Sequence, residues 1–503
     1  MTNKVYLVGA GPGDYKLITL KGIECIKKAD VIIYDRLVST KLLDYRKDNC
    51  KLIYVGKESS NHTKTQDQIN EILWQEASEG KIVTRLKGGD PYVFGRGGEE
   101  GQYLVERNID VEVIPGITSA IGGLAYAGIP ITHRECASSF HVITGHLKDE
   151  NEELNWDVIG RLKGTLVFLM GMGEIKKITL NLREKGMDSN TPVAVINWAT
   201  TDKQKVVTGT LEDIYEITIR EKIKSPSIIV VGEVVRLRQH LNFIENKPLH
   251  GKNILVTRAR QQSSKLSEKI YDLGGNPIEF PVIKIEDLSN NRAICEEIKK
   301  VNENNYIIFT SQNGVKIFFE RMYSLGLDNR QLSNTKIVAI GNTTAEEIKK
   351  YHINPDIVPS NYIAESIYEE VAPLLSASDK ILIPRAKEAR NYLVEELQKI
   401  CNVKELKIYQ TVLGQGIEKK EEIKELILND KIDYITFTSS STVKNLIHML
   451  DNHTDILNET KLISIGPITS KTITDHGLKV HKEAEKYDIN GIIKVLVDDK
   501  KEN

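Results

Sequence analysis

The chain has 503 residues, of which 40% are hydrophobic and 27% are charged, and its formal net charge at pH 7 is −2. This composition is typical of a globular protein, and the length predicts about three domains. A net charge so close to zero excludes a global field that would attract nucleic acid or an anionic membrane. We therefore expect neither as a partner, and an acidic ligand would have to be bound by local clusters of Arg and Lys.

The five cysteines are scattered along the chain without CxxC spacing, which indicates free thiols and no metal site. The first apolar run stops at Gly9, and the longest one, residues 120–131, contains three glycines and a proline. Neither run has the length of a secretory signal or of a membrane span. These features predict a cytoplasmic protein.

In the first half, short apolar runs alternate with amphipathic stretches. The runs are residues 4–9, 31–34, 52–55 and 82–85, and the clearest amphipathic stretches are residues 20–29 and 66–77. This alternation predicts an α/β fold with largely parallel sheets.

The first apolar run leads directly into a glycine-rich loop, within the segment VYLVGAGPGD. Gly9 and Gly11 fit the start of a dinucleotide-binding fingerprint, but Asp14 occupies the position of its third glycine. A carboxylate there would face the pyrophosphate, and Pro12 removes one backbone donor. The loop therefore argues against an oxidoreductase that uses NAD or FAD.

Two further glycine-rich segments follow, RLKGGDPYVFGRGGEE at residues 85–100 and VIPGITSAIGGLAYAGIPITHR at residues 113–134. Because glycine has no side chain, the backbone at such positions can approach a small molecule closely. Three such loops in one half of the chain predict a ligand site rather than three unrelated turns.

A domain boundary is predicted near the middle of the chain. Residues 226–235 have the pattern of a strand and residues 236–244 that of a closing helix, after which Pro248 and Gly251 interrupt the pattern. A new strand is predicted at residues 253–259. We place the boundary at 246–251, which gives domains of residues 1–245 and 251–503.

The second half contains an internal repeat. YIIFTSQNGVKIFF (306–319) resembles YITFTSSSTVKNLI (434–447), and KIVAIGNTTAEEI (336–348) resembles KLISIGPITSKTI (461–473). Each copy predicts a strand, a helix, a strand and a helix, so we expect two consecutive doubly wound lobes of about 125 residues each. Ligands in such folds bind beyond the carboxyl ends of the strands.

A set of segments between residues 3 and 240 carries a family resemblance. The segments are LVGAGPGD, ADVIIYDRLV, YVGK, RLKGGDPYVFGRGGEE, PGITSAIGGLAYAGIPITHR, TGH, VFLMG and IIVVGEVV. Together they resemble the uroporphyrinogen-III C-methyltransferases. The first segment alone indicates only the wider tetrapyrrole methylase fold, and the longer glycine-rich segments narrow the resemblance to this family.

The resemblance implies that S-adenosyl-L-methionine binds in a bent form between two α/β lobes. The matching positions are Pro12, Gly88, Gly89, Asp90, Val93, Thr118, Ser119, Met170 and Ala199. Ala199 stands where the family usually has glycine, so a positive φ at this residue would be strained. The resemblance also implies that Asp35 accepts a proton and that Lys57 donates one.

The chemistry requires such groups, because methylation of a pyrrole carbon by an activated sulfonium leaves a proton to be moved. A carboxylate and an ammonium beside the macrocycle can perform this general acid–base work. The substrate carries eight carboxylates, which suit the donors of Arg and other basic side chains. The candidates for binding them are Arg85, Lys87, Arg96, His133 and Arg134.

Residues 251–503 carry a second resemblance, through the segments ILVTRA, FTSQNGV, AIGNTTA, ILIPRA, YQT, FTSSSTV and SIGPITS. They resemble the uroporphyrinogen-III synthases. That family closes linear hydroxymethylbilane with inversion of the last pyrrole, so its site mainly has to fold the substrate. The candidates for binding substrate are Thr310, Ser311, Arg385, Ser439, Ser440 and Thr469. Tyr409 matches the tyrosine thought to assist loss of the hydroxyl.

The two resemblances predict a bifunctional enzyme, with a two-lobed tetrapyrrole methylase domain followed by a two-lobed synthase. The synthase would make uroporphyrinogen III, and the methylase would methylate it twice to precorrin-2, which leads to siroheme or cobalamin. The methylase family also implies a homodimer through this domain. An alternative stays open: a methylase of another tetrapyrrole joined to a non-catalytic C-terminal binding module.

Overall fold

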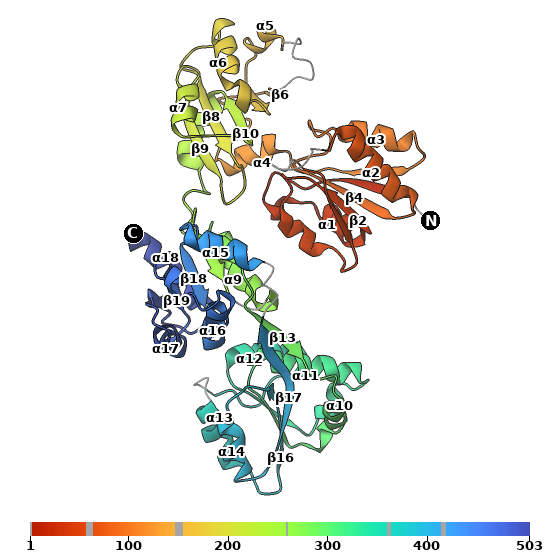
Figure 1. Cartoon of the computed structure of the whole chain (residues 1–503), viewed down its shortest axis with the longest axis vertical. Coiled ribbons are helices and arrows are strands. Elements are labelled where there is room, and N and C mark those ends of the chain that lie inside the picture. The colour runs from red at the N-terminus through yellow and green to blue at the C-terminus, as the bar shows by residue number, and fades with distance from the viewer. Residues whose placement is uncertain are drawn as a thin grey trace. The chain divides into compact units, whose positions relative to one another are not determined.

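The computed structural model describes residues 3–56, 64–145, 154–257, 260–359, 364–413 and 419–502 (Figure 1). The chain divides into two compact units, Met1–Gly251 with Leu273–Gly275 (unit 1) and Lys252–Asp272 with Asn276–Asn503 (unit 2). Within the described residues, each unit contains two five-stranded sheets.

The first sheet of unit 1 is parallel throughout and has the strand order β3-β2-β4-β1-β5. Its strands are β1 (Lys4–Gly9), β2 (Val31–Tyr34), β3 (Lys51–Tyr54), β4 (Ile82–Lys87) and β5 (Asp110–Ile114). Successive side chains of β1 point to opposite faces, so that Leu7 packs in one core and Val8 in another. Both faces are therefore buried, as in other parallel sheets.

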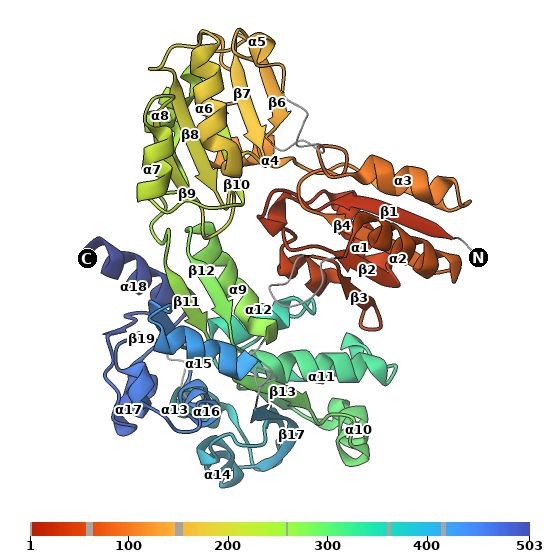
Figure 2. The same ribbon diagram turned by 45° about the horizontal axis from the view of Figure 1, so that its top comes forward.

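The helices of this lobe cover the two faces of the sheet (Figure 2). They are α1 (Leu20–Lys28), α2 (Gln66–Ser78) and α3 (Gly97–Val105). Ile26 of α1 packs on one face, whereas Leu73 of α2 and Leu104 of α3 pack on the other. A capping box of Thr65 and Gln68 fixes the start of α2, because it satisfies two backbone donors that the helix leaves free.

The second sheet of unit 1 has the order β6-β7-β10-β8-β9, and among its described pairs only β6 and β7 are parallel. Its strands are β6 (Phe140–Thr144), β7 (Thr165–Leu169), β8 (Pro192–Asn197), β9 (Lys205–Thr210) and β10 (Ser227–Val231). The expectation of largely parallel sheets is therefore wrong for this lobe. The connection between β8 and β9 is too short for a parallel crossover, so the two strands pair antiparallel.

Helices also cover both faces of this second sheet. They are α4 (Ser119–Tyr126), α5 (Trp156–Ile159), α6 (Ile175–Glu184), α7 (Ile214–Arg220) and α8 (Arg238–Leu241). Leu124 of α4 packs against Val167 and Ala194 on one face, and Ile178 of α6 packs in the core on the other. The strand predicted at residues 226–235 ends at Val231, and the predicted closing helix is reduced to α8.

One lobe of unit 2 has a fully parallel sheet of order β12-β11-β18-β19-β20. Its strands are β11 (Asn253–Val256), β12 (Asn276–Glu279), β18 (Tyr434–Phe437), β19 (Lys461–Ser464) and β20 (Lys482–Glu483). Its helices are α9 (Arg260–Asp272), α15 (Lys420–Leu428), α16 (Ser440–Met449), α17 (Pro467–Asp475) and α18 (Ile489–Glu502). Leu446 of α16 and Ile473 of α17 pack in one core against this sheet.

The other lobe of unit 2 has the order β13-β17-β16-β14-β15, in which only the edge strand β13 is antiparallel among the described pairs. Its strands are β13 (Ile283–Asp287), β14 (Tyr306–Phe309), β15 (Lys336–Ala339), β16 (Lys380–Ala386) and β17 (Asn402–Leu413). Its helices are α10 (Arg292–Lys299), α11 (Gln312–Ser324), α12 (Asn342–Lys349), α13 (Ala364–Val371) and α14 (Tyr392–Gln398).

The internal repeat is confirmed, because β14, α11, β15 and α12 have the same order as β18, α16, β19 and α17. The expectation that the two lobes are consecutive is wrong. The lobe that contains β13–β17 is inserted between β12 and α15, and the sheet of the other lobe is completed only when the chain returns at β18.

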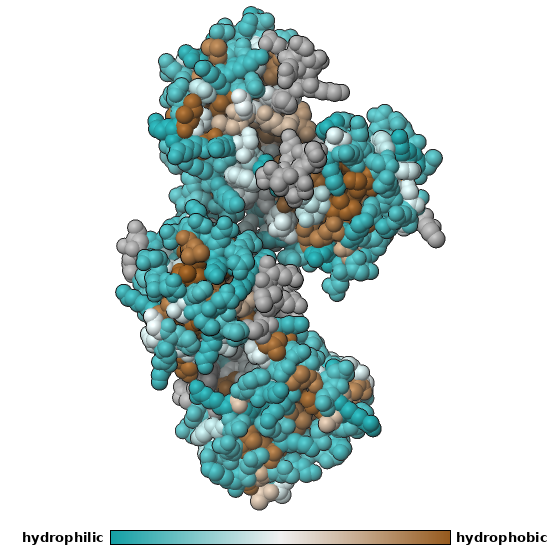
Figure 3. All heavy atoms as spheres, in the orientation of Figure 1, coloured by the Kyte–Doolittle hydropathy of each residue, from teal (hydrophilic) through white to brown (hydrophobic). Residues whose placement is uncertain are grey.

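Each lobe has its own hydrophobic core. In the inserted lobe, Phe309, Phe318 and Phe319 are fully buried and in mutual ring contact. On the molecular face of Figure 3, hydrophilic residues cover most of the surface and hydrophobic residues form separate patches. No helix of the described residues is long and apolar enough to cross a membrane.

Candidate active sites

Unit 1 contains a cavity of about 560 Å³, a size typical of small-molecule sites. It is lined by the loops that follow β1, β2 and β4, by the start of α4, and by residues after β7 and β8. The cavity therefore lies beyond the carboxyl ends of the parallel strands, where α/β folds bind their ligands.

All nine positions assigned to the cofactor by resemblance line this one cavity. They are Pro12, Gly88, Gly89, Asp90, Val93, Thr118, Ser119, Met170 and Ala199. Asp35 lines it as well. The structure therefore brings together residues from six separate segments, a convergence that the sequence pattern alone does not require.

Glycines allow the loops after β1 and β4 to meet. Gly11 and Gly89 exchange two backbone hydrogen bonds of 3.2 and 2.7 Å. A Cβ atom at Gly116 would lie 2.4 Å from the Gly89 carbonyl oxygen, and one at Gly9 would lie 2.5 Å from the Gly116 Cα. Only glycine fits at these crossings, so the cavity wall here is bare backbone whose polar groups can face a cofactor.

Asp14, which occupies the position of the third glycine of the dinucleotide fingerprint, is buried and does not line the cavity. Its carboxylate accepts hydrogen bonds from the Lys16 N–H at 2.9 Å and from the Tyr126 hydroxyl at 2.7 Å, and its own N–H donates to the Thr200 hydroxyl at 3.0 Å. Burial and the Asp14 carboxylate both raise the pKa of Tyr126. Asp14 therefore fixes the glycine-rich loop to α4 and to the segment after β8.

Asp90 stabilises the wall of the cavity through hydrogen bonds of its side chain. Its carboxylate accepts hydrogen bonds from the Gly116 N–H at 2.9 Å and from the Tyr92 N–H at 2.8 Å. These bonds hold the loop after β4 against the loop after β5. The Asp90 backbone is thereby fixed at the cavity edge.

The strain expected at Ala199 falls on its neighbours instead. Trp198 and Thr200 have positive φ values of +46° and +67°, whereas Ala199 does not. Met170 also has a positive φ, +57°, and its side chain is half-exposed at the cavity. Non-glycine residues with a positive φ are uncommon and are enriched at binding sites.

Arg85 and Lys87 line the cavity but are almost completely buried. Lys87 Nζ donates to Glu100 Oε1 at 2.6 Å, and Arg85 Nε approaches the same oxygen at 3.4 Å. Arg85 Nη2 lies 3.5 Å from Asp35 Oδ2. Burial, and then the neighbouring Arg85, lower the pKa of Lys87. Both cations are thus bound to internal carboxylates although they line the cavity, and their role in binding substrate carboxylates stays a prediction.

The other predicted basic residues lie elsewhere. Arg96, His133 and Arg134 are not among the lining residues of the cavity. Arg96 forms a two-pronged ion pair with Glu99, with distances of 2.9 and 2.6 Å, and this bonding raises the pKa of Arg96. Arg134 is exposed. Lys57, the predicted proton donor, lies outside the described residues.

Sequence reasoning missed several lining residues, among them Arg36, Phe94 and Trp198. The Arg36 guanidinium lies 5.9 Å from the centre of the Trp198 ring, within range of a cation–π contact. The segment NWATT, with an aromatic residue directly before Ala199, was a usable signal for Trp198. No group of three or more His, Cys, Asp or Glu side chains in the described ranges could hold a metal ion.

In unit 2, Ser311 and Tyr409 form the clearest polar contact among the predicted residues. The Ser311 hydroxyl accepts the Gly314 N–H at the start of α11 and lies 2.8 Å from the Tyr409 hydroxyl. Thr310 precedes Ser311 and is partly exposed. Burial raises the pKa of Tyr409, so its hydroxyl stays protonated and can donate.

At the equivalent sheet edge of the other lobe, a serine after the strand again caps the helix that follows. Ser439 caps α16 by accepting the Thr442 N–H at 3.4 Å, and the Ser440 hydroxyl donates to the Ile468 carbonyl at 3.2 Å. Thr469 is buried near the start of α17. Its role in binding substrate stays a prediction.

Arg385 is also buried, with an exposed fraction of 2%. Its guanidinium donates to the Arg390 carbonyl at 2.8 Å and pairs with Glu405 at 3.4 Å. Its guanidinium therefore has partners inside the lobe, and its role in binding substrate stays a prediction. A short apolar strand places Arg385 at an inward position that sequence alone did not distinguish.

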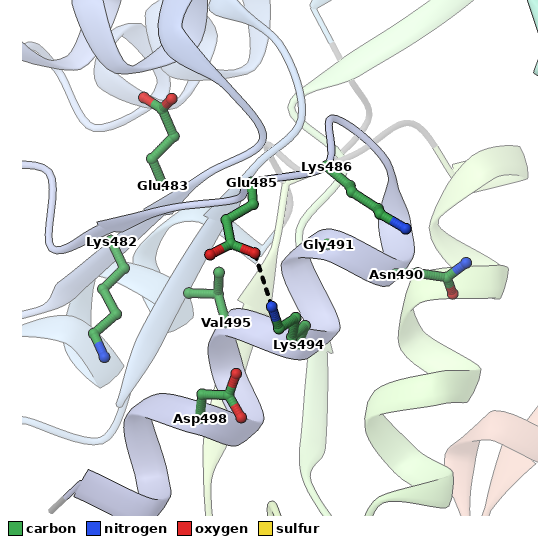
Figure 4. A pocket seen from close by; sticks show the side chains of 9 residues that line it. All are labelled: Lys482, Glu483, Glu485, Lys486, Asn490, Gly491, Lys494, Val495 and Asp498. Carbon is green, nitrogen blue, oxygen red and sulfur yellow. Dashed lines mark hydrogen bonds and ion pairs between the residues drawn. The ribbon is translucent and has the colours of Figure 1, made fainter.

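A second hollow of about 500 Å³ lies between β20 and α18 in unit 2 (Figure 4). Its lining is mostly charged, and Figure 4 shows Glu485 directed at Lys494, with an ion-pair distance of 2.7 Å. None of the predicted site residues lines it. Neither Ser311 nor Tyr409 borders this hollow.

Comparison with known families matches both halves of the chain. The tetrapyrrole (corrin/porphyrin) methylase family matches residues 4–215, and the uroporphyrinogen-III synthase HemD family matches residues 264–494. A porphyrin biosynthesis protein HemD of Ruminiclostridium josui is 38% identical over 98% of this chain and 97% of its own length. A uroporphyrinogen-III C-methyltransferase of Priestia megaterium is 52% identical over 46% of this chain and 98% of its own length.

One solved structure is that of a uroporphyrin-III C-methyltransferase from Thermus thermophilus complexed with S-adenosyl homocysteine. It is 39% identical, with a TM-score of 0.41, and the match covers 46% of this chain and 99% of that one.

The chain is therefore an enzyme of tetrapyrrole biosynthesis that combines a methyltransferase dependent on S-adenosylmethionine with a synthase. It belongs to the family in which a uroporphyrinogen-III C-methyltransferase is fused to a uroporphyrinogen-III synthase.

Proposed function

We propose that unit 2 closes hydroxymethylbilane to uroporphyrinogen III and that unit 1 methylates this product twice to precorrin-2. The observation that carries the proposal is the convergence of nine predicted cofactor residues and Asp35 on one cavity. The proposed domain limits are residues 1–245 and 251–503. We further propose that the enzyme is cytoplasmic and forms a homodimer through the methyltransferase domain, as the family resemblance implies.

The cavity fits S-adenosylmethionine in size and in the chemistry of its wall. The backbone of Gly88 lines the cavity, the Gly89 carbonyl oxygen can accept a further hydrogen bond, and the hydroxyl of Thr118 lies at the start of α4. Met170, Val93 and Trp198 offer apolar and aromatic surface. When bound, this cofactor supplies an activated methyl group on a positively charged sulfur.

In the methylation step, we assign the proton-accepting role to Asp35. Its side chain is about a quarter exposed, with a relative exposure of 28%, and it lines the cavity. The Leu37 N–H donates to its Oδ1 at 3.1 Å, and Arg85 lies at its Oδ2. These contacts orient the carboxylate while leaving part of it open to a substrate, as a general base requires.

In the synthase step, we assign proton donation to Tyr409. Loss of the hydroxyl from hydroxymethylbilane is assisted when a neutral acid protonates the leaving oxygen. Ser311 fixes the direction of the phenol group, and burial keeps the phenol protonated. The partly exposed hydroxyls of Thr310, Ser439 and Ser440 are proposed to bind substrate carboxylates.

The test supplies the full chain with hydroxymethylbilane and S-adenosylmethionine and follows the products by mass and isomer analysis. The expected product is dimethylated. The Asp35→Asn variant should accumulate uroporphyrinogen III without methylation, because its synthase unit is unchanged. A wild-type chain that methylates added uroporphyrinogen III but leaves hydroxymethylbilane to close without inversion would contradict the synthase assignment.

A further inference from the structure

Four charged side chains form a row along one wall of the unit 1 cavity. From Asp35 the row passes through Arg85 and Glu100 to Lys87, so that the charges alternate in sign. The distances are 3.5 Å from Asp35 to Arg85, 3.4 Å from Arg85 to Glu100 and 2.6 Å from Glu100 to Lys87. Asp35, Arg85 and Lys87 line the cavity, whereas Glu100 is fully buried and does not.

Glu100 is an unusual choice for a purely structural position. Its Oε1 accepts bonds from Lys87, from Arg85 and from Gln66 Nε2 at 3.2 Å, whereas its buried Oε2 has no hydrogen-bond partner among the described residues. Burying a carboxylate is costly unless it is fully bonded, and apolar residues often replace buried ion pairs without loss of stability. The half-bonded carboxylate therefore points to a need for negative charge at this place.

We propose that Glu100 is a positioning residue for Asp35, which holds Arg85 and Lys87 in place and balances their charge. This inference rests on the proposed function, in which Asp35 accepts the proton released by methylation. An unbalanced cation beside a carboxylate favours its charged form and makes it a weaker base. Because Arg85 is shared between two carboxylates, Asp35 keeps an orienting partner without facing an unbalanced cation.

Lys87 is part of the same balance. Burial and Arg85 lower the pKa of Lys87, whereas the Glu100 and Asp35 carboxylates act in the opposite direction. Loss of Glu100 would therefore lower the pKa of Lys87 further and leave Arg85 without its second carboxylate. The charge of Arg85, together with the charge that Lys87 still carries, would then act on Asp35 alone.

Other charged groups face the row and stay unchanged in the test. Arg36 follows Asp35 in the chain and lies over the Trp198 ring. Arg96 is paired with Glu99 on the exposed start of α3 and interacts electrostatically with Glu100. Variants that alter only Glu100 or Lys87 therefore report on the row itself.

The test is the pH dependence of kcat/KM for methyl transfer to uroporphyrinogen III by the full chain. Glu100→Gln should lower kcat and move the acidic limb of the profile to lower pH by about half a unit or more. Lys87→Met should move the acidic limb to higher pH. The double variant Glu100→Gln/Lys87→Met, which removes one charge of each sign, should return the limb toward the wild-type position. Glu106→Gln, which removes an exposed carboxylate at the end of α3, should leave the limb in place.

Titration of the substrate carboxylates contributes equally in every variant, so differences between profiles belong to the enzyme. Single variants that leave the limb unmoved, or that move it in the same direction, overturn the inference. If one single variant fails to fold in a thermal unfolding control, the other single variant and the double variant still have an expected direction for the shift of the acidic limb. If Asp35→Asn keeps the wild-type profile, the role of Asp35 fails, which is a different outcome from an unmoved limb in Glu100→Gln.

Discussion

The hydroxyl groups of Ser311 and Tyr409 lie 2.8 Å apart, although 98 positions separate the two residues in the chain. Ser311 begins α11 at the end of β14, and Tyr409 lies on β17, on the other side of β16 in the same sheet. The contact therefore exists only when the inserted lobe is folded. It joins the first copy of the repeat to the residue that family resemblance assigns to catalysis.

Replacement of Tyr409 by Phe should reduce the rate of enzymatic uroporphyrinogen III formation by about 100-fold, because the general acid is lost while the ring still fills its site. The measurement is the ratio of inverted to non-inverted ring product from hydroxymethylbilane. Ser311→Ala should show a smaller loss, since it keeps the phenol and removes only its orienting partner. Equal activity of Tyr409→Phe and wild type would remove Tyr409 from the mechanism.

The contribution of Tyr409 to the synthase rate should persist to at least about pH 9, because its phenol keeps its proton there. A phenol ordinarily titrates near pH 10, and burial raises the pKa of Tyr409 above this value. The protonated form, which is the donor, therefore persists as pH rises through the usual range. The rate ratio of wild type to Tyr409→Phe is expected to stay constant between pH 7 and about 9. A ratio that falls toward one below pH 9 contradicts this role.

Gly116→Ala should abolish methyl transfer and leave the synthase active. The added Cβ would lie 2.4 Å from the Gly89 carbonyl oxygen, so the crossing of the two loops would have to open and the cavity wall would be lost. Isothermal titration with S-adenosylmethionine should show at least tenfold weaker binding.

Gly98→Ala is the matched control. Gly98 lies in α3, is exposed and has no atom within 4 Å of the added Cβ. The substitution should leave binding unchanged and stabilise the helix by about 0.5 kcal/mol. Similar losses of binding in both variants would show that the crossing itself is unimportant.

Tyr126→Phe should destabilise unit 1 by about 1–3 kcal/mol, since it leaves one oxygen of the buried Asp14 without its donor. The same substitution should weaken binding of S-adenosylmethionine, because Asp14 fixes the loop that carries Pro12. Tyr103→Phe offers a control, since its hydroxyl also donates to a carboxylate, Glu71, at 2.8 Å, in a part-buried position that does not line the cavity. Binding should be unaffected in that variant.

The sequence predicted the elements of the first sheet closely, because their signals are local. The strand at 4–9 and the helix start at Leu20 coincide with β1 and α1, where an apolar run and the capping residue Thr19 define the limits. The cofactor residues could likewise be assigned, since each belongs to a short segment with a recognisable pattern. Their convergence on one cavity then followed from the fold.

Features that depend on distant pairing could not be predicted. The insertion of one synthase lobe into the other depends on β11 pairing with the distant strand β18, and no local pattern encodes such a partner. The burial of Arg85, Lys87 and Arg385 was missed for the same reason. A basic residue beside a glycine-rich loop suggests an anion site, but Glu100 and Glu405, which bind these cations internally, are separated from them in sequence.

Asp499 connects α18 to the sheet of unit 2, and its loss should destabilise that unit. The carboxylate is buried and accepts hydrogen bonds from Lys461 at 2.7 Å, His481 at 2.6 Å and Tyr434 at 2.9 Å. These bonds outweigh burial and hold the pKa of Asp499 well below its usual range. Asp499→Asn leaves the neighbouring cation unpaired, so the free energy of unfolding of unit 2 should fall by about 3 kcal/mol at pH 7.

The sign of the pH dependence follows from the depressed pKa of Asp499. Its unfolded value is about 3.9, so the stabilisation is fully present above about pH 5 and is lost as pH falls through the folded-state pKa. The difference in unfolding free energy between wild type and Asp499→Asn should therefore shrink below pH 5. Urea unfolding of the full chain measures it, in the transition that S-adenosylmethionine does not shift. Asp498→Asn, one position earlier on α18, should leave this transition nearly unchanged, and a difference that grows toward acid pH would contradict the assignment.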